Sequence, residues 1–373
     1  MMKLQVAMPT RLIVEKGAVA AHAEIFTDMG RRCLLVTDHT AGRLSGALGD
    51  VTRVLDAADI PWSEFDRIGP NPTAAVCVQG SEAGRAFGAD FVVGIGGGSP
   101  MDAAKAIAVL MANPDLTAET LRGARKNPPL PCVLVGTTAG TGSEVTRFAV
   151  LTHPDGEKSS ISGVDIMARA AFGDPVRYTM GLKREVTFAT ALDAAAHAVE
   201  SYFMATADEI SKGFSIMAMR LLIKNFRELC GGVWPPSARQ REELYAASIY
   251  GGFAINTAGT GFCHQIGHAL TEVQGAVHGN ACAALLREFL RMAEERAPEE
   301  TAAFCAGIGI AGTTEIWELI HAMLPGGMRP FTAEELAQLL PRWEKAPAAA
   351  RHPGGMCAAD YRAAAESALG AAE

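Results

Sequence analysis

Short apolar runs alternate with amphipathic stretches through the first half of the chain, and this alternation constrains the fold more than any other feature. The runs are apolar almost throughout, which is typical of parallel strands that are covered on both faces. These runs lie at 32–37, 91–95 and 132–135, and further strand candidates lie at 148–152, 158–162 and 170–173. The helix-like stretches lie near 18–29, 42–58, 72–87 and 100–111. Strands that alternate with helices predict an α/β domain built on an open parallel sheet.

The pattern changes near residue 183, where strand signals end and long stretches rich in Ala, Leu and Met begin. The clearest of these stretches are 185–203, 209–230 and 239–257. We therefore expect two domains, an α/β domain over 1–180 and an all-helical domain over 181–373.

Composition excludes several classes of protein. Apolar residues make up 49% of the 373 residues and charged residues 20%, which is typical of a globular protein. The net charge of −8 argues against a nucleic-acid partner, because phosphates attract basic surfaces.

No apolar run approaches the roughly 18 residues of a membrane span, and the N-terminal residues show no cleavable signal pattern. The eight cysteines form no Cys-x-x-Cys pair, which argues against a disulfide framework. We expect a cytoplasmic protein that binds neither membranes nor nucleic acid.

A glycine-rich loop follows the expected strand at 91–95 and opens a helix. It contains three consecutive glycines, Gly96 to Gly98, followed by Ser99. Such glycines let the backbone approach a phosphate, and a helix N-terminus favours its negative charge. The loop is neither the common dinucleotide fingerprint, whose last glycine would fall at Ser99, nor a Walker A loop. A tight turn is the alternative reading.

Two further features favour a nucleotide ligand. A second loop of small and hydroxylated residues, 136–146, follows the strand at 132–135. In open parallel sheets, loops at the carboxyl ends of strands line the ligand crevice. Asp38 ends the strand at 32–37, where its carboxylate could bind an adenosine ribose and repel a 2′-phosphate, favouring NAD over NADP. A helix cap is the alternative role for Asp38.

Carboxylate and imidazole side chains recur at helical spacing in the second half of the chain. Asp193 and His197 lie four residues apart among small apolar neighbours. His264 and His268 are also four residues apart, and His278 follows ten residues further on. Residues four apart share one face of a helix, and these side chains suit iron or zinc. Each pair alone is more often a packing or capping feature, and the spacing leaves open whether the two helices meet.

Taken together and in this order, the motifs resemble the iron-containing (group III) alcohol dehydrogenases over essentially the whole chain. The matching segments are 96–105, 137–146, 193–197 and 264–278. The resemblance implies a dehydroquinate synthase-like fold, with a nucleotide-binding α/β domain, a helical metal domain and a cleft between them. It also implies NAD and a divalent metal, with iron expected and zinc possible.

The resemblance assigns roles to individual residues. The implied metal ligands are Asp193, His197, His264 and His278, while His268 matches a position near the nicotinamide and the metal. The implied cofactor contacts are Asp38, Asn71, Gly97, Gly98, Ser99, Asp102, Thr137, Thr138, Ser143 and Lys158. The chain departs from the usual family pattern at Ala191, Ala269 and Val277, where the family usually has glycine, proline and proline. These departures bear on the shape of the substrate pocket.

The expected function is a metal-dependent alcohol dehydrogenase or aldehyde reductase that transfers hydride between a small primary alcohol or diol and NAD. His268 is the expected proton relay, and Phe148, Ile255 and Cys263 are candidate pocket residues. A non-redox lyase of the dehydroquinate synthase type is the alternative, although such enzymes need Lys and Arg residues for a phosphorylated, carboxylate-rich substrate. A nucleotide-binding or metal-binding protein without turnover is a further alternative. The family commonly forms dimers or larger assemblies, so we expect a homo-oligomer.

Overall fold

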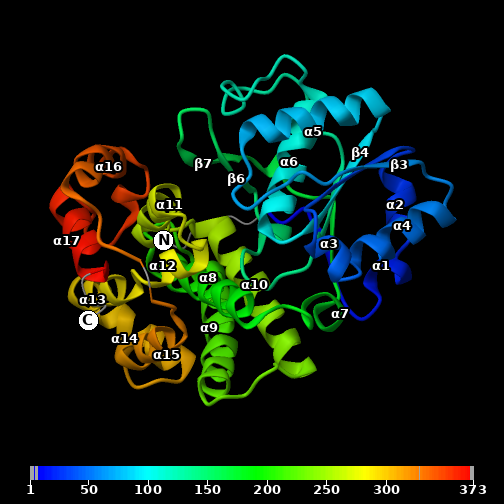
Figure 1. The fold of residues 1–373 in the computed structure, drawn as a ribbon. Coiled ribbons are helices and arrows are strands. Elements are labelled where there is room, and N and C mark those ends of the chain that lie inside the picture. The colour runs from blue at the N-terminus through cyan, green and yellow to red at the C-terminus, as the bar shows by residue number, and fades with distance from the viewer. Residues whose placement is uncertain (1–3, 5–6, 327, 370–373) are drawn as a thin grey trace. The chain divides into compact units, whose positions relative to one another are not determined.

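The computed structural model describes residues 4, 7–326 and 328–369. These residues form two structural units: an α/β unit from Ala7 to Leu182 and a helical unit from Lys183 onward. Each unit has its own elements and its own buried residues (Figure 1).

The α/β unit contains a sheet of six parallel strands in the order β1-β8-β5-β4-β2-β3. Its strands are β1 (Arg11–Val14), β2 (Cys33–Thr37), β3 (Trp62–Phe65), β4 (Phe91–Gly96), β5 (Cys132–Gly136) and β8 (Ala170–Gly173). The predicted open parallel sheet is confirmed. The sequence analysis missed β1 and β3, which are the partly exposed edge strands. No continuous apolar run marks β3, whereas the short run Leu12 to Val14 of β1 was overlooked. The runs at 148–152 and 158–162 form a separate antiparallel hairpin, β6 (Phe148–Thr152) and β7 (Lys158–Ser162).

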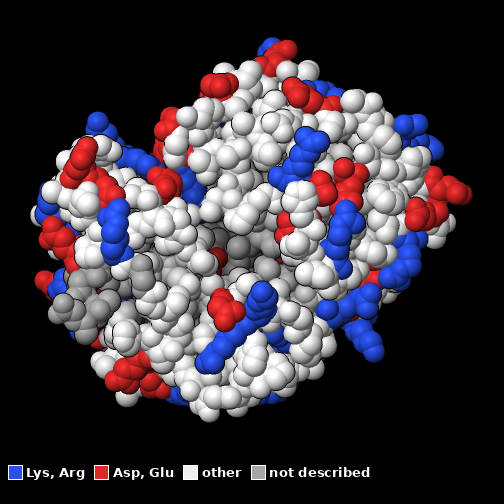
Figure 2. Space-filling model, in the orientation of Figure 1, with Lys and Arg blue, Asp and Glu red and all other residues white. Residues whose placement is uncertain are grey.

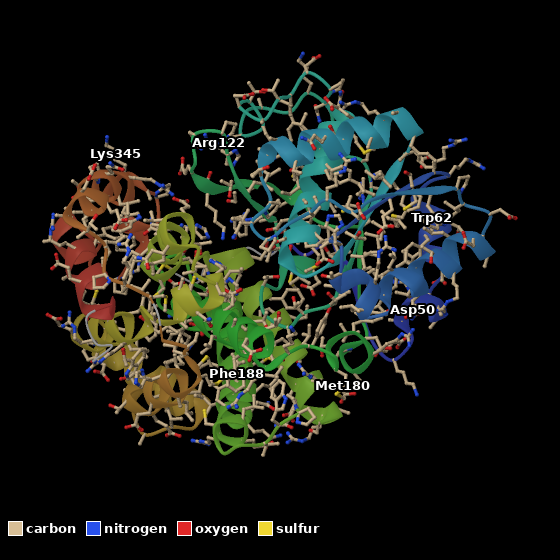
Figure 3. The ribbon with its side chains drawn as sticks, in the orientation of Figure 1. Asp50, Trp62, Arg122, Met180, Phe188 and Lys345 are labelled. Atoms are coloured by element: carbon tan, nitrogen blue, oxygen red, sulfur yellow. The ribbon has the colours of Figure 1, made fainter. Side chains whose placement is uncertain are left out.

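Helices cover both faces of the sheet, which explains why its central strands are apolar on both sides. In β2, Leu34 and Val36 join the core that includes residues of α5 (Ala74–Phe87) and α6 (Gly98–Ala112). Cys33 and Leu35 join the core on the other face, which includes residues of α4 (Ala47–Ala57). Asp50 of α4, labelled in Figure 3, accepts hydrogen bonds from Arg177 of α7 at 2.5 and 2.8 Å. The helices of this unit are α1 (Ala18–Ala21), α2 (Glu24–Met29), α3 (Ala41–Leu44), α4 (Ala47–Ala57), α5 (Ala74–Phe87), α6 (Gly98–Ala112) and α7 (Pro175–Thr179).

Ten α-helices and no strand are found among the described residues from 183 onward. They are α8 (Arg184–Phe203), α9 (Glu209–Cys230), α10 (Ala238–Ala258), α11 (Phe262–Gln274), α12 (His278–Ala283), α13 (Leu286–Arg296), α14 (Pro298–Ile308), α15 (Thr313–Met323), α16 (Ala333–Lys345) and α17 (Ala358–Leu369). Capping boxes at Asp208, Ser237 and Thr332 fix where α9, α10 and α16 begin.

Helix α8 lies at the centre of the helical unit, and its residues are buried almost continuously from Thr187 to Phe203. Small side chains let other helices approach it closely. At Gly279 of α12, a Cβ atom would lie 2.0 Å from the carbonyl oxygen of Ala189 in α8. Only glycine fits there, so the sequence of α12 is tied to the position of α8.

Lys and Arg side chains are interspersed with Asp and Glu over the face shown in Figure 2. Among the helices of the described residues, none is by itself long and apolar enough to cross a membrane; α14 and α15 meet that test only as a pair bent by 64°.

Candidate functional site

The two predicted loops of the α/β unit lie next to each other, because β4 and β5 are adjacent parallel strands with Gly96 paired to Gly136. A Cβ atom at Gly97 would lie 3.1 Å from the Thr138 hydroxyl oxygen, and one at Gly98 would lie 2.6 Å from a Thr141 methyl carbon. The backbone of the glycine loop therefore packs directly on the second loop, and α6 begins at Gly98. A helix N-terminus beside small residues suits a phosphate group.

A buried polar network holds this pair of loops together. Ser143 donates a hydrogen bond of 2.5 Å to Asp102, whose second oxygen accepts one of 2.9 Å from the amide of Val150. The fully buried Lys105 ammonium donates to the Ser143 hydroxyl at 2.9 Å and to the Phe148 carbonyl at 2.8 Å. Burial lowers the pKa of Lys105. Asp102 and Ser143 thus bond to each other, and both shape the loops.

The Thr137 hydroxyl fits a nucleotide cradle. Thr137 is 1% exposed, and its hydroxyl oxygen has no hydrogen-bond partner within the protein. A buried hydroxyl without a partner costs free energy, and a bound ligand can supply the missing bond. Thr138 and Ser99 are half-exposed on the same two loops.

The remaining predicted cofactor residues of this unit are Asp38, Asn71 and Lys158. One oxygen of Asp38 accepts hydrogen bonds from the amides of Thr40 and Ala41, at 3.1 and 2.6 Å. The capping role that the sequence allowed is therefore present. Lys158 of β7 donates to the Asn71 side chain at 2.9 Å, so these two residues lie together, and Asn71 has a positive φ of 54°.

The helical unit brings all four predicted metal ligands together. Asp193 and His197 lie on α8, His264 on α11 and His278 at the first position of α12. The distance from the Asp193 Oδ1 atom is 3.7 Å to Nε2 of His264, 3.7 Å to Nε2 of His278 and 4.0 Å to Nε2 of His197. The imidazoles of His197 and His264 are stacked, with ring centroids 4.5 Å apart.

This cluster fits a divalent ion. Ligands at 2.0–2.2 Å from a tetrahedral ion lie about 3.4 Å from one another, close to the observed separations. Asp193 Oδ1 and His264 Nε2 are buried and have no hydrogen-bond partner, which is costly unless an ion binds them. Burial alone would raise the pKa of Asp193, but the imidazoles of His197, His278 and His264 lower it below its usual range.

Glu200 is a functional candidate that the sequence analysis missed. It is fully buried on α8, and its carboxylate accepts hydrogen bonds from Nδ1 of His264 and from the amides of Gly261 and Cys263 at 3.0 and 2.8 Å. A carboxylate that binds the far nitrogen of a metal-binding histidine fixes its tautomer and its orientation. The available signal was its spacing, seven residues after Asp193 and therefore on the same face of α8.

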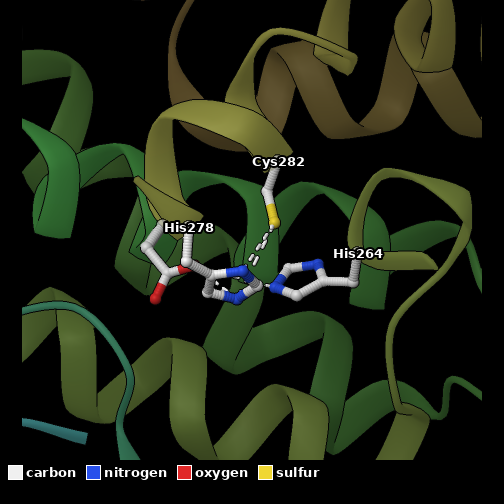
Figure 4. Close-up of side chains that lie close together, drawn as sticks. His264, His278 and Cys282 are labelled. Carbon is white, nitrogen blue, oxygen red and sulfur yellow. Dashed lines mark hydrogen bonds and ion pairs between the residues drawn. The ribbon is translucent and has the colours of Figure 1, made fainter. Parts of the chain in front are cut away.

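Cys282 was also missed, although it follows His278 by one helical turn. One donor atom each from Asp193, His264, His278 and Cys282 lie within 4.8 Å of one another. Figure 4 shows the three labelled members of this group, His264, His278 and Cys282.

His268 and the candidate pocket residues are placed as follows. The His268 ring is stacked against His278 with ring centroids 5.1 Å apart, and its centroid is 6.4 Å from that of His264. His268 is therefore beside the cluster.

The candidate pocket residues lie in both units. Phe148 is half-buried in β6 of the α/β unit, whereas Ile255 of α10 and Cys263 of α11 are buried in the helical unit. Their role in a substrate pocket stays a prediction.

Comparison with known proteins decides the family. A model described as iron-containing alcohol dehydrogenase matches residues 9–175, and one for the C-terminal part of the same family matches residues 187–322. This chain belongs to the iron-containing alcohol dehydrogenase family. The resemblance inferred from the motifs is confirmed.

Several relatives in the family are dehydrogenases or reductases. The chain is 34% identical to 1,3-propanediol dehydrogenase of Citrobacter freundii over 268 residues, which cover 70% of this chain and 68% of that protein. It is 31% identical to lactaldehyde reductase of Escherichia coli over 282 residues, 74% of this chain and 72% of the relative. It is 30% identical to the bifunctional aldehyde-alcohol dehydrogenase of Escherichia coli over 80% of this chain, but this match spans only 35% of that longer protein.

Solved structures of the family share the fold. An iron-containing alcohol dehydrogenase from Thermotoga maritima is 32% identical, with a TM-score of 0.89 over 98% of this chain and 99% of that one. A sulfoacetaldehyde reductase from Bifidobacterium kashiwanohense, solved in complex with NAD+, is 26% identical, with a TM-score of 0.86 over the full length of both chains.

Proposed function

We propose that this family member is an NAD-dependent, metal-dependent alcohol dehydrogenase or aldehyde reductase. The observation that carries the proposal is the cluster of Asp193, His197, His264 and His278, with Nε2 atoms of three helices facing one carboxylate oxygen at 3.7–4.0 Å. When bound, a divalent ion would act as a Lewis acid toward the alcohol oxygen and NAD would accept the hydride. Iron is the expected ion and zinc suits the same donors.

The residues of the helical unit then have distinct tasks. Asp193 and the three histidines would hold the ion, and Glu200 orients His264 by accepting a hydrogen bond from its Nδ1 atom. His268 lies beside His278, with ring centroids 5.1 Å apart, and is not one of the proposed ligands. We assign it the transfer of the alcohol proton, since an imidazole changes its charge near neutral pH.

The α/β unit is the proposed NAD-binding domain. Gly97, Gly98 and Ser99 offer a helix N-terminus for the pyrophosphate, and the Thr137 hydroxyl offers an unused hydrogen-bonding group. Asp38 keeps one carboxylate oxygen beyond the one that caps α3, which suits a ribose hydroxyl and disfavours a 2′-phosphate. The proposal therefore assigns NAD rather than NADP.

A small primary alcohol or diol is the proposed substrate, as in the relatives named for 1,3-propanediol and lactaldehyde. The experiment is a panel of short primary alcohols, diols and hydroxy acids, with NADH formation measured for each. The proposal predicts net NADH from at least one small alcohol. Consumption of a substrate without net NADH would favour the lyase, and binding of NAD without any turnover would favour a binding protein.

We also propose a cytoplasmic homo-oligomer. All eight cysteines are unpaired thiols, which a reducing compartment favours. Size-exclusion chromatography with light scattering tests the assembly, and a mass equal to one chain would contradict it.

A further inference from the structure

Cys282 is buried beside the proposed metal centre. It lies on α12 four residues after His278, so the two side chains share one face of the helix. Its Sγ atom lies 3.7 Å from Nδ1 and 3.8 Å from Nε2 of His278. Figure 4 shows the sulfur directed toward the imidazoles.

The neighbouring helix leaves room for this sulfur. Gly267 lies on α11, three residues after His264. A Cβ atom at Gly267 would lie 2.7 Å from the Cys282 Sγ atom. Any larger residue at 267 would displace the thiol from its place beside the imidazoles. The sulfur therefore sits between the two helices that carry His264 and His278.

The distances also suit a shared ion. Around an ion with five ligands, a thiolate at about 2.3 Å and a neighbouring imidazole at about 2.0–2.1 Å are about 3.1–3.8 Å apart. The distance of 3.8 Å from the Cys282 Sγ atom to Nε2 of His278 lies within that range. Two further donors of the same group, Asp193 Oδ1 and His264 Nε2, are buried without a hydrogen-bond partner.

We propose that Cys282 is a ligand of the divalent ion, so that the centre contains a thiolate in addition to its carboxylate and imidazoles. The proposal rests on the metal centre proposed above and changes its chemistry. A thiolate is a soft donor, and soft donors favour zinc over metals that prefer oxygen ligands. The expected consequence is a higher preference for zinc over ferrous iron than the carboxylate and imidazoles alone provide.

Cobalt is the probe, because it replaces zinc and reports thiolate ligands by a sulfur-to-metal charge-transfer band in the near ultraviolet. The full-length protein is stripped of metal with a chelator, cobalt(II) is added, and the spectrum and bound metal per chain are measured. We expect the band in the unmodified protein and its loss in Cys282→Ser and Cys282→Ala. The matched control is Cys305→Ala, which removes another buried thiol of the helical unit, on α14, and should keep the band.

The outcomes separate this proposal from the metal centre itself. Cobalt bound without a charge-transfer band, or a band that persists in both Cys282 variants, would show that the sulfur only fills space between α11 and α12. A chain that binds no cobalt at all would overturn the metal centre as well. If neither Cys282 variant retains cobalt, a band in the unmodified protein that survives Cys305→Ala supports Cys282, the thiol of the donor group, and a band that is lost in Cys305→Ala overturns the proposal.

A competition experiment tests the consequence for metal choice. Metal-free protein is offered equal amounts of zinc and ferrous iron without oxygen, and the bound metals are measured. We expect the ratio of bound zinc to bound iron to fall in Cys282→Ser relative to Cys305→Ala. An unchanged ratio would contradict the selectivity that the thiolate is proposed to provide.

Discussion

Replacing Gly279 by alanine should break the metal centre, because the added atom would enter the contact between α12 and α8 beside His278 and Asp193. The added Cβ atom would lie 2.0 Å from the Ala189 carbonyl oxygen, whereas ordinary contacts begin at 3.4 Å. Helix α12 must therefore move away from α8 by about 1.4 Å. Overpacking of this kind costs about 1–3 kcal/mol, and we expect the upper end because a backbone atom is in the way.

The same movement carries His278, the neighbour of Gly279, away from Asp193. Metal sites tolerate changes of about 0.2 Å in ligand distance, so Gly279→Ala should lose bound metal after dialysis. Urea unfolding and metal analysis measure both effects. The control is Gly213→Ala in α9, where a Cβ atom meets nothing within 4 Å and alanine should stabilise the helix by about 0.5–1 kcal/mol. A Gly279→Ala protein that binds metal normally and loses no stability would refute this reasoning.

Three further predictions concern single side chains. Glu200→Gln removes the charge that orients His264 and should weaken zinc binding by about 10–100-fold, measured by competition with a chromophoric chelator; unchanged affinity would contradict the role of Glu200. Thr137→Val removes the unpartnered hydroxyl and should weaken NAD binding by about tenfold. The free energy of unfolding of the ligand-free protein should stay the same or rise. Calorimetric titration with NAD measures the binding, and an unaltered dissociation constant would count against a role of this hydroxyl in NAD binding. His352 accepts a 2.9 Å hydrogen bond from the amide of Phe262, and burial lowers the pKa of His352 from 6.5 to about 4. Between these two pKa values the unfolded chain binds a proton that the folded chain does not, so the free energy of unfolding should fall by up to about 3 kcal/mol as the pH drops from about 6.5 to 4. Urea unfolding should show a smaller fall for His352→Gln than for the unmodified protein. Equal falls in the two proteins would exclude this histidine as the cause.

The sequence sufficed for the central strands and for the long helices, because both leave periodic apolar patterns. The continuous apolar runs at β2, β4 and β5 arise from burial on both faces. The edge strands β1 and β3 are partly exposed; no such run marks β3, and the run in β1 is only three residues long, from Leu12 to Val14. The runs of β6 and β7 were recognised as strands, but their pairing as a hairpin was missed, although the five-residue connection with Pro154, Asp155 and Gly156 is a hairpin signal.

The site was predictable where residue types were unusual for their spacing. Asp193 and His197 stood out among small apolar residues. The histidines of α11 stood out by their spacing of four residues. That α8, α11 and α12 meet could not be read from spacing, since it depends on close approaches such as that at Gly279. Glu200 and Cys282 were missed because a single acidic residue or thiol on a helix carries no signal until its neighbours in space are known.

The most direct test of the proposed function is metal-dependent turnover. NADH formation from a small alcohol is measured with the protein as purified, after chelation, and after adding back iron or zinc, alongside His264→Ala treated in the same way. We predict that chelation abolishes turnover, that a divalent ion restores it, and that His264→Ala stays inactive. Turnover that is indifferent to chelation and to His264→Ala would contradict the metal centre of Asp193, His197, His264 and His278.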